Sequence, residues 1–295
     1  MNVRRDLILW LLLLPALIYL LFFRYKPYLG IQIAFKNYRV TKDMWDCDWV
    51  GLKNFEKLFK TAIFPTVIEN TVILSLLKIV IGFPAPIILA LLLNEVRSNA
   101  YKRTLQTVMY LPHFLSWVVV GNLVFLFFAP NSGILSQMIF NMGGNRLRFM
   151  TDPDQFRLLL VFSDIWKGVG WGTIVYMAAL SGIDAQLYEA AVVDGANRFQ
   201  QMMHITLPCL MPTIMTMLVL RMGGILHAGF EQVFVLENDL VKSTSEVIDT
   251  YVYKISFVQS QYSVGTAANL FQSVIGLIFV LVSNRVSRIF GQEVI

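Results

Sequence analysis

The sequence predicts an all-α membrane protein with six transmembrane helices. Of its 295 residues, 56% are hydrophobic and only 15% are charged, and both values are shifted from the averages of soluble domains toward those of membrane proteins. Several apolar runs reach about 20 residues, the length of helix that crosses a hydrocarbon core of about 30 Å. The runs fall at residues 7–24, 66–94, 105–129, 158–181, 209–236 and 266–287.

The first run follows Arg4 and Arg5, as the apolar part of a secretion signal would. It lacks a small-x-small cleavage site and continues through Phe23, so we expect an uncleaved first membrane helix. Pro15 is tolerable inside that helix because neighbouring helices can satisfy the freed carbonyl group.

The second and fifth runs carry residues that interrupt helices. The second should bend or break near its middle, where it holds Gly82, Pro84 and Pro86. The fifth opens with Pro208 and Pro212, which is consistent with a helix start, and then carries Gly223-Gly224 and Gly229.

The connections between the runs differ in character. Residues 25–65 are polar and contain a short amphipathic helix with Leu52, Phe55, Leu58 and Phe59 on one side, which we expect near the membrane interface. No linker or repeat divides the chain, so residues 1–295 are interpreted as one transmembrane domain.

Residues 182–207 hold the most informative pattern. Glu189-Ala190-Ala191 is followed after three residues by Gly195, and after nine more by Ile205-Thr206-Leu207-Pro208. Alanines allow close approach of a partner, and a carboxylate is favoured near a helix N-terminus. Glycine permits a turn, and Leu207-Pro208 opens the next membrane helix. The expected docking residues are Glu189, Ala190, Ala191, Asp194, Gly195, Ile205, Leu207 and Pro208.

The alternative interpretation of this segment is an interfacial helix without a partner. So many specified positions at fixed spacing rarely coincide by chance, which favours docking. The pattern resembles the cytoplasmic loop by which permeases of binding-protein-dependent ABC importers dock onto their ATPases. Similarity to the oligo- and polysaccharide-uptake branch of that family covers nearly the whole chain, including residues 24–27, 51–55, 111–112, 229–232 and 246–251.

The resemblance implies a type I importer permease with a cytoplasmic coupling helix and no catalytic residues. It implies a second, usually different, permease subunit, two ATPase subunits that carry ATP and Mg, and an external solute-binding protein. The substrate would be an oligo- or polysaccharide, and one importer of this branch carries the acidic polysaccharide alginate. The chain itself lacks Gly-x-x-x-x-Gly-Lys-[Ser/Thr], so it does not cradle ATP and needs no cofactor of its own.

The distribution of Lys and Arg does not set the orientation. With the N-terminus inside, eight of them lie on the inner side and thirteen on the outer side, against the positive-inside rule. We expect both termini in the cytoplasm of a bacterium, with the chain in the cytoplasmic (inner) membrane, because the docking loop must face cytoplasmic ATP. That orientation rests on the resemblance.

Polar side chains inside the apolar runs are candidates for the substrate pathway. A charge in hydrocarbon is costly, so each should face a cavity, a partner subunit or an opposite charge. Sugar hydroxyls need donors and acceptors, and sugar rings pack on aromatic rings. The alternative is that the cations pair with carboxylates between helices and that the tryptophans anchor at the interface. The candidates are Lys78, Trp166, Lys167, Arg221, Phe230, Glu231, Asn269 and Gln272.

Several functions are disfavoured. The net charge is +5, but no basic stripe interleaved with aromatics indicates nucleic acid. Cys47 and Cys209 are too far apart in sequence for a zinc motif, and no catalytic or metal-ligating set is expected.

Two rival functions remain at this stage. An ion-coupled secondary transporter would need a carboxylate relay at mid-membrane, for which Asp164 is a weak candidate, and it would leave the docking loop unexplained. A membrane-embedded glycosyltransferase would need a metal-binding Asp-x-Asp. Asp46-Cys47-Asp48 and Asp152-Pro153-Asp154 have that spacing, but both are expected on the outer side, away from nucleotide-sugars.

Overall fold

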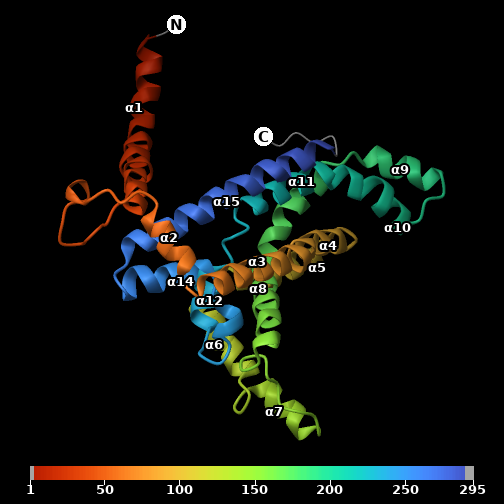
Figure 1. The fold of residues 1–295 in the computed structure, drawn as a ribbon. Helices are drawn as coiled ribbons and strands as arrows, with labels where there is room; N and C mark the ends of the chain where they lie inside the picture. Colours follow the sequence, from red (N-terminus) through yellow and green to blue (C-terminus); the bar gives the residue numbers. More distant parts are fainter. Residues whose placement is uncertain (1–2, 290–295) are drawn as a thin grey trace. The chain divides into compact units, whose positions relative to one another are not determined.

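The computed structural model describes residues 3–289, which fold into helices joined by turns and loops (Figure 1). These residues form two compact units, one of residues 3–64 and 252–273 and one of residues 65–251 and 274–289. The helices are α1 (Val3–Leu20), α2 (Lys53–Lys60), α3 (Phe64–Leu77), α4 (Pro84–Asn94), α5 (Asn99–Tyr110), α6 (Trp117–Phe128), α7 (Ile134–Asn141), α8 (Pro153–Ser181), α9 (Ala185–Val193), α10 (Arg198–Gln201), α11 (Leu207–Gly223), α12 (Phe230–Leu236), α13 (Lys242–Ser245), α14 (Ile248–Tyr253) and α15 (Tyr262–Ile289).

The helical segments that can cross a membrane agree with the six expected. Within residues 3–289, five of them are long and apolar enough by themselves, and a pair of helices bent by 103° makes a sixth when it counts as one broken span. The five are Leu9–Phe35, Phe64–Asn94, Pro153–Ser181, Arg198–Gly223 and Tyr262–Arg285, and the bent pair is Asn99–Phe114 with Trp117–Phe128.

The third span differs from the continuous helix expected over residues 105–129. Its α-helix ends at Tyr110, one tighter helical turn covers Leu111–Phe114, and the chain then bends before α6 begins at Trp117. The turn contains Pro112, whose ring nitrogen has no hydrogen to donate. The Ser116 hydroxyl caps the new helix α6 by accepting a hydrogen bond from the Val119 amide at 3.3 Å. On the other side of the break, the Lys167 ammonium donates to the carbonyl oxygen of His113 at 2.7 Å. The apolar composition continues through the break, so hydropathy does not reveal it.

The fifth span also departs from its expected bounds of 209–236. Helix α11 ends at Gly223, residues 224–229 are not helical, and Gly229 has a φ of +95° before α12 begins. Glycine at both positions explains the break, because it forms helix poorly and accepts a positive φ without strain. The span instead begins earlier, at Arg198.

The first two spans follow the sequence more closely. The first stays helical to Phe35, so the polar connection begins about ten residues later than expected. The second is interrupted where glycine and proline predicted a bend. A π-helical turn, Lys78–Gly82, joins α3 to α4 there.

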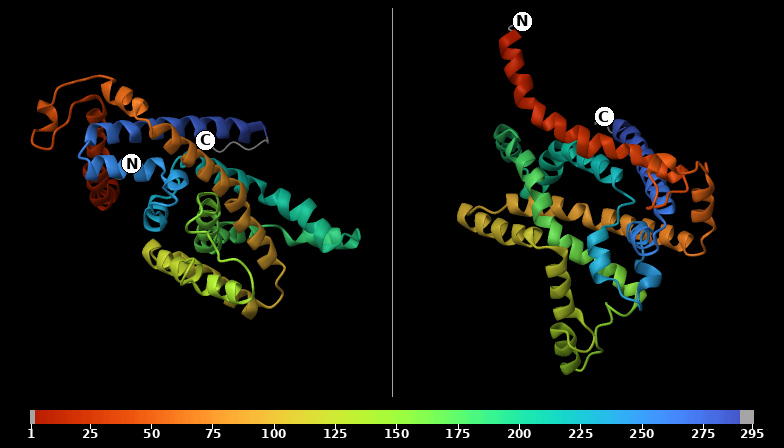
Figure 2. Two further views of the ribbon diagram at one scale, coloured as in Figure 1. Left: turned by 60° about the horizontal axis from the view of Figure 1, so that its bottom comes forward. Right: turned by 90° about the vertical axis from the view of Figure 1, so that its left-hand side faces the viewer.

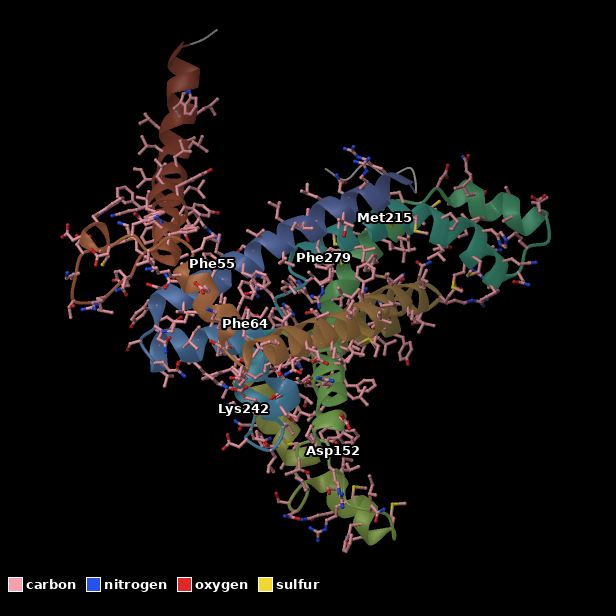
Figure 3. All side chains as sticks on the ribbon, in the orientation of Figure 1. Phe55, Phe64, Asp152, Met215, Lys242 and Phe279 are labelled. Atoms are coloured by element: carbon pink, nitrogen blue, oxygen red, sulfur yellow. The ribbon has the colours of Figure 1, made fainter. Side chains whose placement is uncertain are left out.

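In the first unit, the amphipathic helix α2 packs part of its apolar side against other residues of the same unit (Figure 3). Leu58 is fully buried, the Phe55 ring lies 5.5 Å from Phe35, and the Phe59 ring lies 5.3 Å from Phe271. The lysines of α2 remain exposed. The predicted amphipathic helix is therefore present, and its apolar side is only partly covered, since Leu52 is 68% and Phe59 49% exposed.

The second unit is built around α8, against which α4 and α5 pack (Figure 2). Asp152 caps the first turn of α8, where its carboxylate accepts a hydrogen bond from the Asp154 amide at 3.0 Å (Figure 3). Two buried apolar clusters lie along the helix. One includes Phe156 and Leu160 and the other includes Tyr176 and Leu180. Side chains of α8 between these clusters are therefore held in fixed positions.

Candidate functional site

The docking motif folds into a helical hairpin of α9 and α10 that leads into α11 (Figures 1 and 2). Helix α9 ends in a Schellman motif. The Ala196 amide donates to the Ala191 carbonyl at 2.9 Å, and the Gly195 amide donates to the Val192 carbonyl at 3.1 Å. Gly195 has a φ of +80°. The glycine of the motif is thus the left-handed residue that closes the helix.

The beginnings of both helices of the hairpin are also capped. The Asp184 carboxylate accepts a hydrogen bond from the Gln186 amide at 2.9 Å at the start of α9. Asn197 and Gln200 form a reciprocal capping box around the start of α10. Because each terminus has its own local hydrogen bonds, the hairpin is defined without a partner protein.

One contact that the sequence did not reveal braces the hairpin. The hydroxyl groups of Tyr188 and Thr206 lie 2.9 Å apart and connect α9 with the helical turn before α11. The Gln201 amide group donates to the Ala196 carbonyl at 2.9 Å. A tyrosine immediately before Glu189 is the only sequence signal that could have indicated this brace. The brace therefore ties α9 to the helical segment that leads into α11.

The outer surface of the hairpin is apolar and open. Val193 is 87% exposed, and Leu187, Val192 and Phe199 are exposed as well. Of the expected docking residues, Glu189, Ala190, Asp194, Gly195 and Pro208 are exposed, and Ala191, Ile205 and Leu207 are half-buried. The structure therefore places Glu189, Ala190, Ala191, Asp194 and Gly195 on or at the end of α9, in a hairpin that retains an uncovered apolar surface. Ile205, Leu207 and Pro208 follow in the helical turn before α11 and in its first turn.

A second polar cluster lies inside the second unit, at the interruption of the second span. The Lys78 ammonium donates to the Ala228 carbonyl at 2.8 Å and to Oε1 of Gln232 at 2.5 Å. The Gln232 amide nitrogen in turn donates to Leu160 O at 2.6 Å and to Ser163 Oγ at 2.8 Å. Lys78 thus holds the non-helical residues 224–229 of the fifth span against α3 and α8.

The same cluster contains one carboxylate between two cations. Asp164 of α8 lies 3.6 Å from the Lys78 ammonium and 3.8 Å from the Arg221 guanidinium. Arg221 stands in the last turn of α11, where the helix dipole favours a cation. Lys78 and Arg221, both expected in the pathway, therefore meet through Asp164.

Asp164 and Arg221 line a cavity of about 350 Å³ between α4, α8 and α11. Trp171 and Tyr176 also line this cavity. The Trp171 ring stacks on His113 with the centroids 4.5 Å apart. Aromatic rings and one charged pair thus border the same space.

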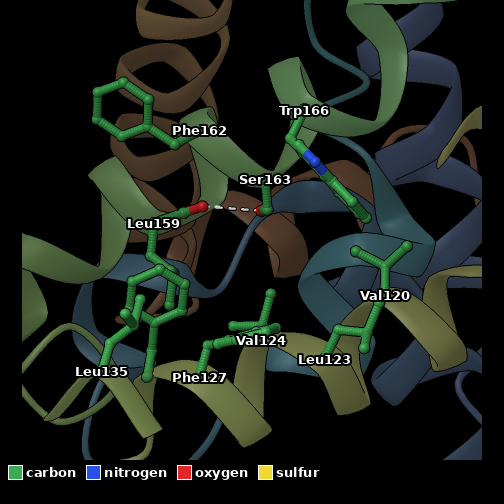
Figure 4. A pocket seen from close by; sticks show the side chains of 10 residues that line it. Val120, Leu123, Val124, Phe127, Leu135, Leu159, Phe162, Ser163 and Trp166 are labelled. Carbon is green, nitrogen blue, oxygen red and sulfur yellow. Dashed lines mark hydrogen bonds between the residues drawn. The ribbon is translucent and has the colours of Figure 1, made fainter. Parts of the chain in front are cut away.

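Trp166 and Lys167 lie away from that cavity. Lys167 bonds to the His113 carbonyl and lies 5.6 Å from the centre of the Trp117 ring, where it supports the break in the third span. Trp166 lines a separate cavity of about 420 Å³ between α6 and α8, bordered by apolar side chains and Ser163 (Figure 4). Geometry therefore separates these two residues from Arg221.

The remaining expected residues are dispersed. The Phe230 ring stacks on Phe234 at 5.3 Å, and Glu231 is exposed. Asn269 is exposed and Gln272 is buried, and both belong to the first unit.

Neither the cysteines nor the acidic pairs form a metal site within residues 3–289. Both Cys47 and Cys209 are free thiols. No group of three or more His, Cys, Asp or Glu side chains in this part of the chain could hold a metal ion. In the pair Asp152-Pro153-Asp154, the Asp152 carboxylate has a structural role, because it caps the start of α8.

Comparison with known proteins identifies the family. Residues 82–294 match the family of binding-protein-dependent transport system inner membrane components. The protein LplB of Bacillus subtilis (strain 168) is 45% identical over 98% of this chain and 91% of its own length. YteP of the same organism, a polygalacturonan/rhamnogalacturonan transport system permease protein, is 43% identical over 97% of this chain and 89% of its own length.

Solved structures also match the fold of this chain over nearly its whole length. A chain of a bacterial ABC transporter involved in the import of the acidic polysaccharide alginate superimposes with a TM-score of 0.90 at 42% identity, over 97% of both chains. A second structure of an alginate transporter, in complex with an alginate pentasaccharide-bound periplasmic protein, gives the same TM-score and identity. The chain therefore belongs to the family of inner membrane components of binding-protein-dependent transport systems.

Proposed function

We propose that this chain is the transmembrane permease subunit of an ATP-driven ABC importer for oligo- or polysaccharides. The whole chain acts as one permease domain and forms the translocation pathway with a second, different permease. Two ATPase subunits bind ATP and Mg on the cytoplasmic side, and an external solute-binding protein delivers the sugar. Both termini lie in the cytoplasm. The ion-coupled and glycosyltransferase alternatives are set aside because the chain belongs to the binding-protein-dependent family.

The observation that carries the proposal is the α9 hairpin. It combines an exposed apolar surface with capped helix ends and a braced connection to α11. A rigid helix of this kind transmits the closure of an ATPase pair to the membrane helices. In the resulting cycle, ATP closes the ATPases and opens the pathway outward to receive sugar, and hydrolysis returns it to the inward-facing state.

The substrate class follows from the relatives. YteP is named for polygalacturonan and rhamnogalacturonan, and the matching structures belong to alginate importers. All three names refer to polymers that contain uronic acids, so an acidic oligo- or polysaccharide is the favoured substrate. The broken fifth span beside the Asp164–Arg221 cavity supports a pathway there, because interrupted helices mark substrate sites in transporters. Lys167, Phe230, Glu231, Asn269 and Gln272 remain candidates along the route.

Co-purification tests this function. We expect a tagged chain, extracted from its native membrane in mild detergent, to bring an ATPase and a second permease with it and to hydrolyse ATP. Gly195→Asp should abolish ATPase association or coupled hydrolysis, because it adds strain and charge at the end of α9. Gly143→Asp is the matched control, since Gly143 ends α7 with a φ of +86° in equally open space. A chain that purifies alone and transports without ATP would refute the proposal.

A further inference from the structure

The wall of the cavity between α4, α8 and α11 offers a charged side chain to a ligand, an inference that rests on the proposed function. Two of its lining side chains are charged, Asp164 from α8 and Arg221 from α11. The Arg221 side chain is 51% exposed, whereas the Lys78 side chain behind it is 6% exposed. A ligand that enters the cavity can therefore reach the guanidinium of Arg221 but cannot reach the ammonium of Lys78.

The charges at this point do not balance. Two cations, Lys78 and Arg221, share the single carboxylate of Asp164 at 3.6 and 3.8 Å. The other acceptors of Lys78 are the neutral oxygens of Ala228 and Gln232. The cluster thus carries one positive charge in excess. Lys78 and Asp164 lie near the middle of the second and fourth spans, where an unbalanced charge is costly, and Arg221 joins them from the last turn of α11.

The excess charge is presented by the side chain best suited to bind an anion. A guanidinium has five N–H donors in a planar fork that matches a carboxylate. Asp164 lies beyond hydrogen-bond distance from Arg221, so it lowers the local positive charge without occupying that fork. The Arg221 guanidinium therefore borders the cavity with its N–H donors available to an anionic ligand.

We propose that Arg221 binds the carboxylate of a uronic acid residue of the substrate, and that Asp164 and Lys78 set the strength of this contact. The carboxylate of the ligand brings the cluster of two cations and one anion to neutrality. Trp171 and Tyr176 border the same cavity and offer surface for the sugar ring. Asp164 also keeps binding reversible, because it restores partial neutrality when the sugar leaves, as a translocation pathway requires.

The test is a double-mutant cycle between the protein and its ligand. The complete importer is placed in lipid nanodiscs without its solute-binding protein, and binding of a labelled tetrauronide is measured by equilibrium dialysis. The second ligand is the same tetrasaccharide with its carboxyl groups reduced to alcohols. We expect Arg221→Gln to weaken tetrauronide binding at least tenfold and to change binding of the reduced sugar by less than twofold. Arg221→Lys should retain an intermediate affinity.

Three outcomes overturn the inference. Equal loss of both ligands in Arg221→Gln would mean that Arg221 supports the fold and does not recognise the carboxylate. Absence of tetrauronide binding to the wild-type complex, or unchanged binding in the variant, would exclude the anion site. Arg103→Gln, which removes an exposed cation of α5, controls for the change in net charge.

The same preparation separates this inference from the proposed function. ATP hydrolysis that is stimulated by the sugar-loaded solute-binding protein supports the importer and does not depend on which residue holds the carboxylate. Stimulated hydrolysis together with unchanged tetrauronide binding in Arg221→Gln would reject the anion site alone. Absence of stimulation in the wild-type complex would reject the importer.

Discussion

The hydroxyl groups of Tyr188 and Thr206 lie 2.9 Å apart and join α9 to the helical turn that precedes α11. The contact spans 18 residues and connects the exposed hairpin with the span that contains Arg221. Without this contact, a displacement of α9 could reach α11 only through the backbone of the hairpin.

We expect Tyr188→Phe to loosen this connection while the fold is retained. Loss of one such hydrogen bond costs about 1 kcal/mol, and Thr206 keeps the Gln201 carbonyl as an acceptor at 3.4 Å. The number of ATP molecules hydrolysed per sugar imported should rise roughly twofold to fivefold, the range that about 1 kcal/mol supports. Tyr101→Phe, an exposed tyrosine on α5, should leave that ratio unchanged. An unchanged ratio in Tyr188→Phe would show that the brace does not transmit motion.

Alanine variants at Gly195 and Gly143 separate the effect of backbone strain on stability from the effect on sugar-stimulated ATP hydrolysis. Both glycines follow a helix in a left-handed conformation, with φ of +80° and +86°, and each helix closes with the same pair of Schellman hydrogen bonds. Alanine at either position should cost about 1–2 kcal/mol, because a Cβ is unfavourable at positive φ. Thermal unfolding in nanodiscs should report similar losses for the two variants.

Only Gly195→Ala should also reduce sugar-stimulated ATP hydrolysis, because only α9 belongs to the docking hairpin. Gly195→Asn should recover much of the activity, since asparagine tolerates this backbone conformation. Equal ATPase activity in Gly195→Ala and Gly143→Ala would argue against α9 as the docking helix.

Lys78→Met should destabilise the protein strongly. The substitution removes the donor to Ala228 O and Gln232 Oε1 and leaves the Asp164 carboxylate with one cation. Each buried acceptor that loses its donor typically costs about 1–3 kcal/mol. The thermal unfolding midpoint in nanodiscs should fall accordingly, while the exposed Lys53→Met on α2 should not change it. A midpoint equal to that of the wild type would show that residues 224–229 do not need this contact.

Asp164→Asn should strengthen substrate binding and slow transport. Without the carboxylate, the cluster carries two uncompensated positive charges, so a uronate should bind Arg221 more tightly. Release should then limit the cycle, and both KM and kcat for tetrauronide uptake should fall. Weaker binding in this variant would mean that Asp164 itself contacts the sugar.

Much of this architecture could be predicted from the sequence, and the exceptions have physical causes. The six apolar runs and the docking motif are local patterns, and both correspond to helices of the structure. The break between Phe114 and Trp117 was not predicted because the apolar run of residues 105–129 continues through it. The early end of α11 at Gly223 could have been inferred from the glycine pair, but the apolar run extends beyond it.

The polar clusters depend on contacts that no local pattern contains. Lys78, Asp164 and Arg221 come from three different spans, so only the folded chain shows that they meet. Similarly, Trp166 and Lys167 are neighbours in sequence on α8, yet they face different surroundings.

The Lys78 contacts also constrain how the chain is made. Ala228 and Gln232 follow Lys78 by 150 and 154 residues, which corresponds to roughly 8–30 s of translation. During this interval the second span holds an ammonium group in mid-membrane before its acceptors have been synthesised. The strongly apolar remainder of that span compensates for a lysine at the cost of about 2.5–3.5 kcal/mol found in insertion experiments. Biogenesis of the permease therefore includes a late step, in which Ala228 and Gln232 reach the second span and accept the hydrogen bonds of Lys78.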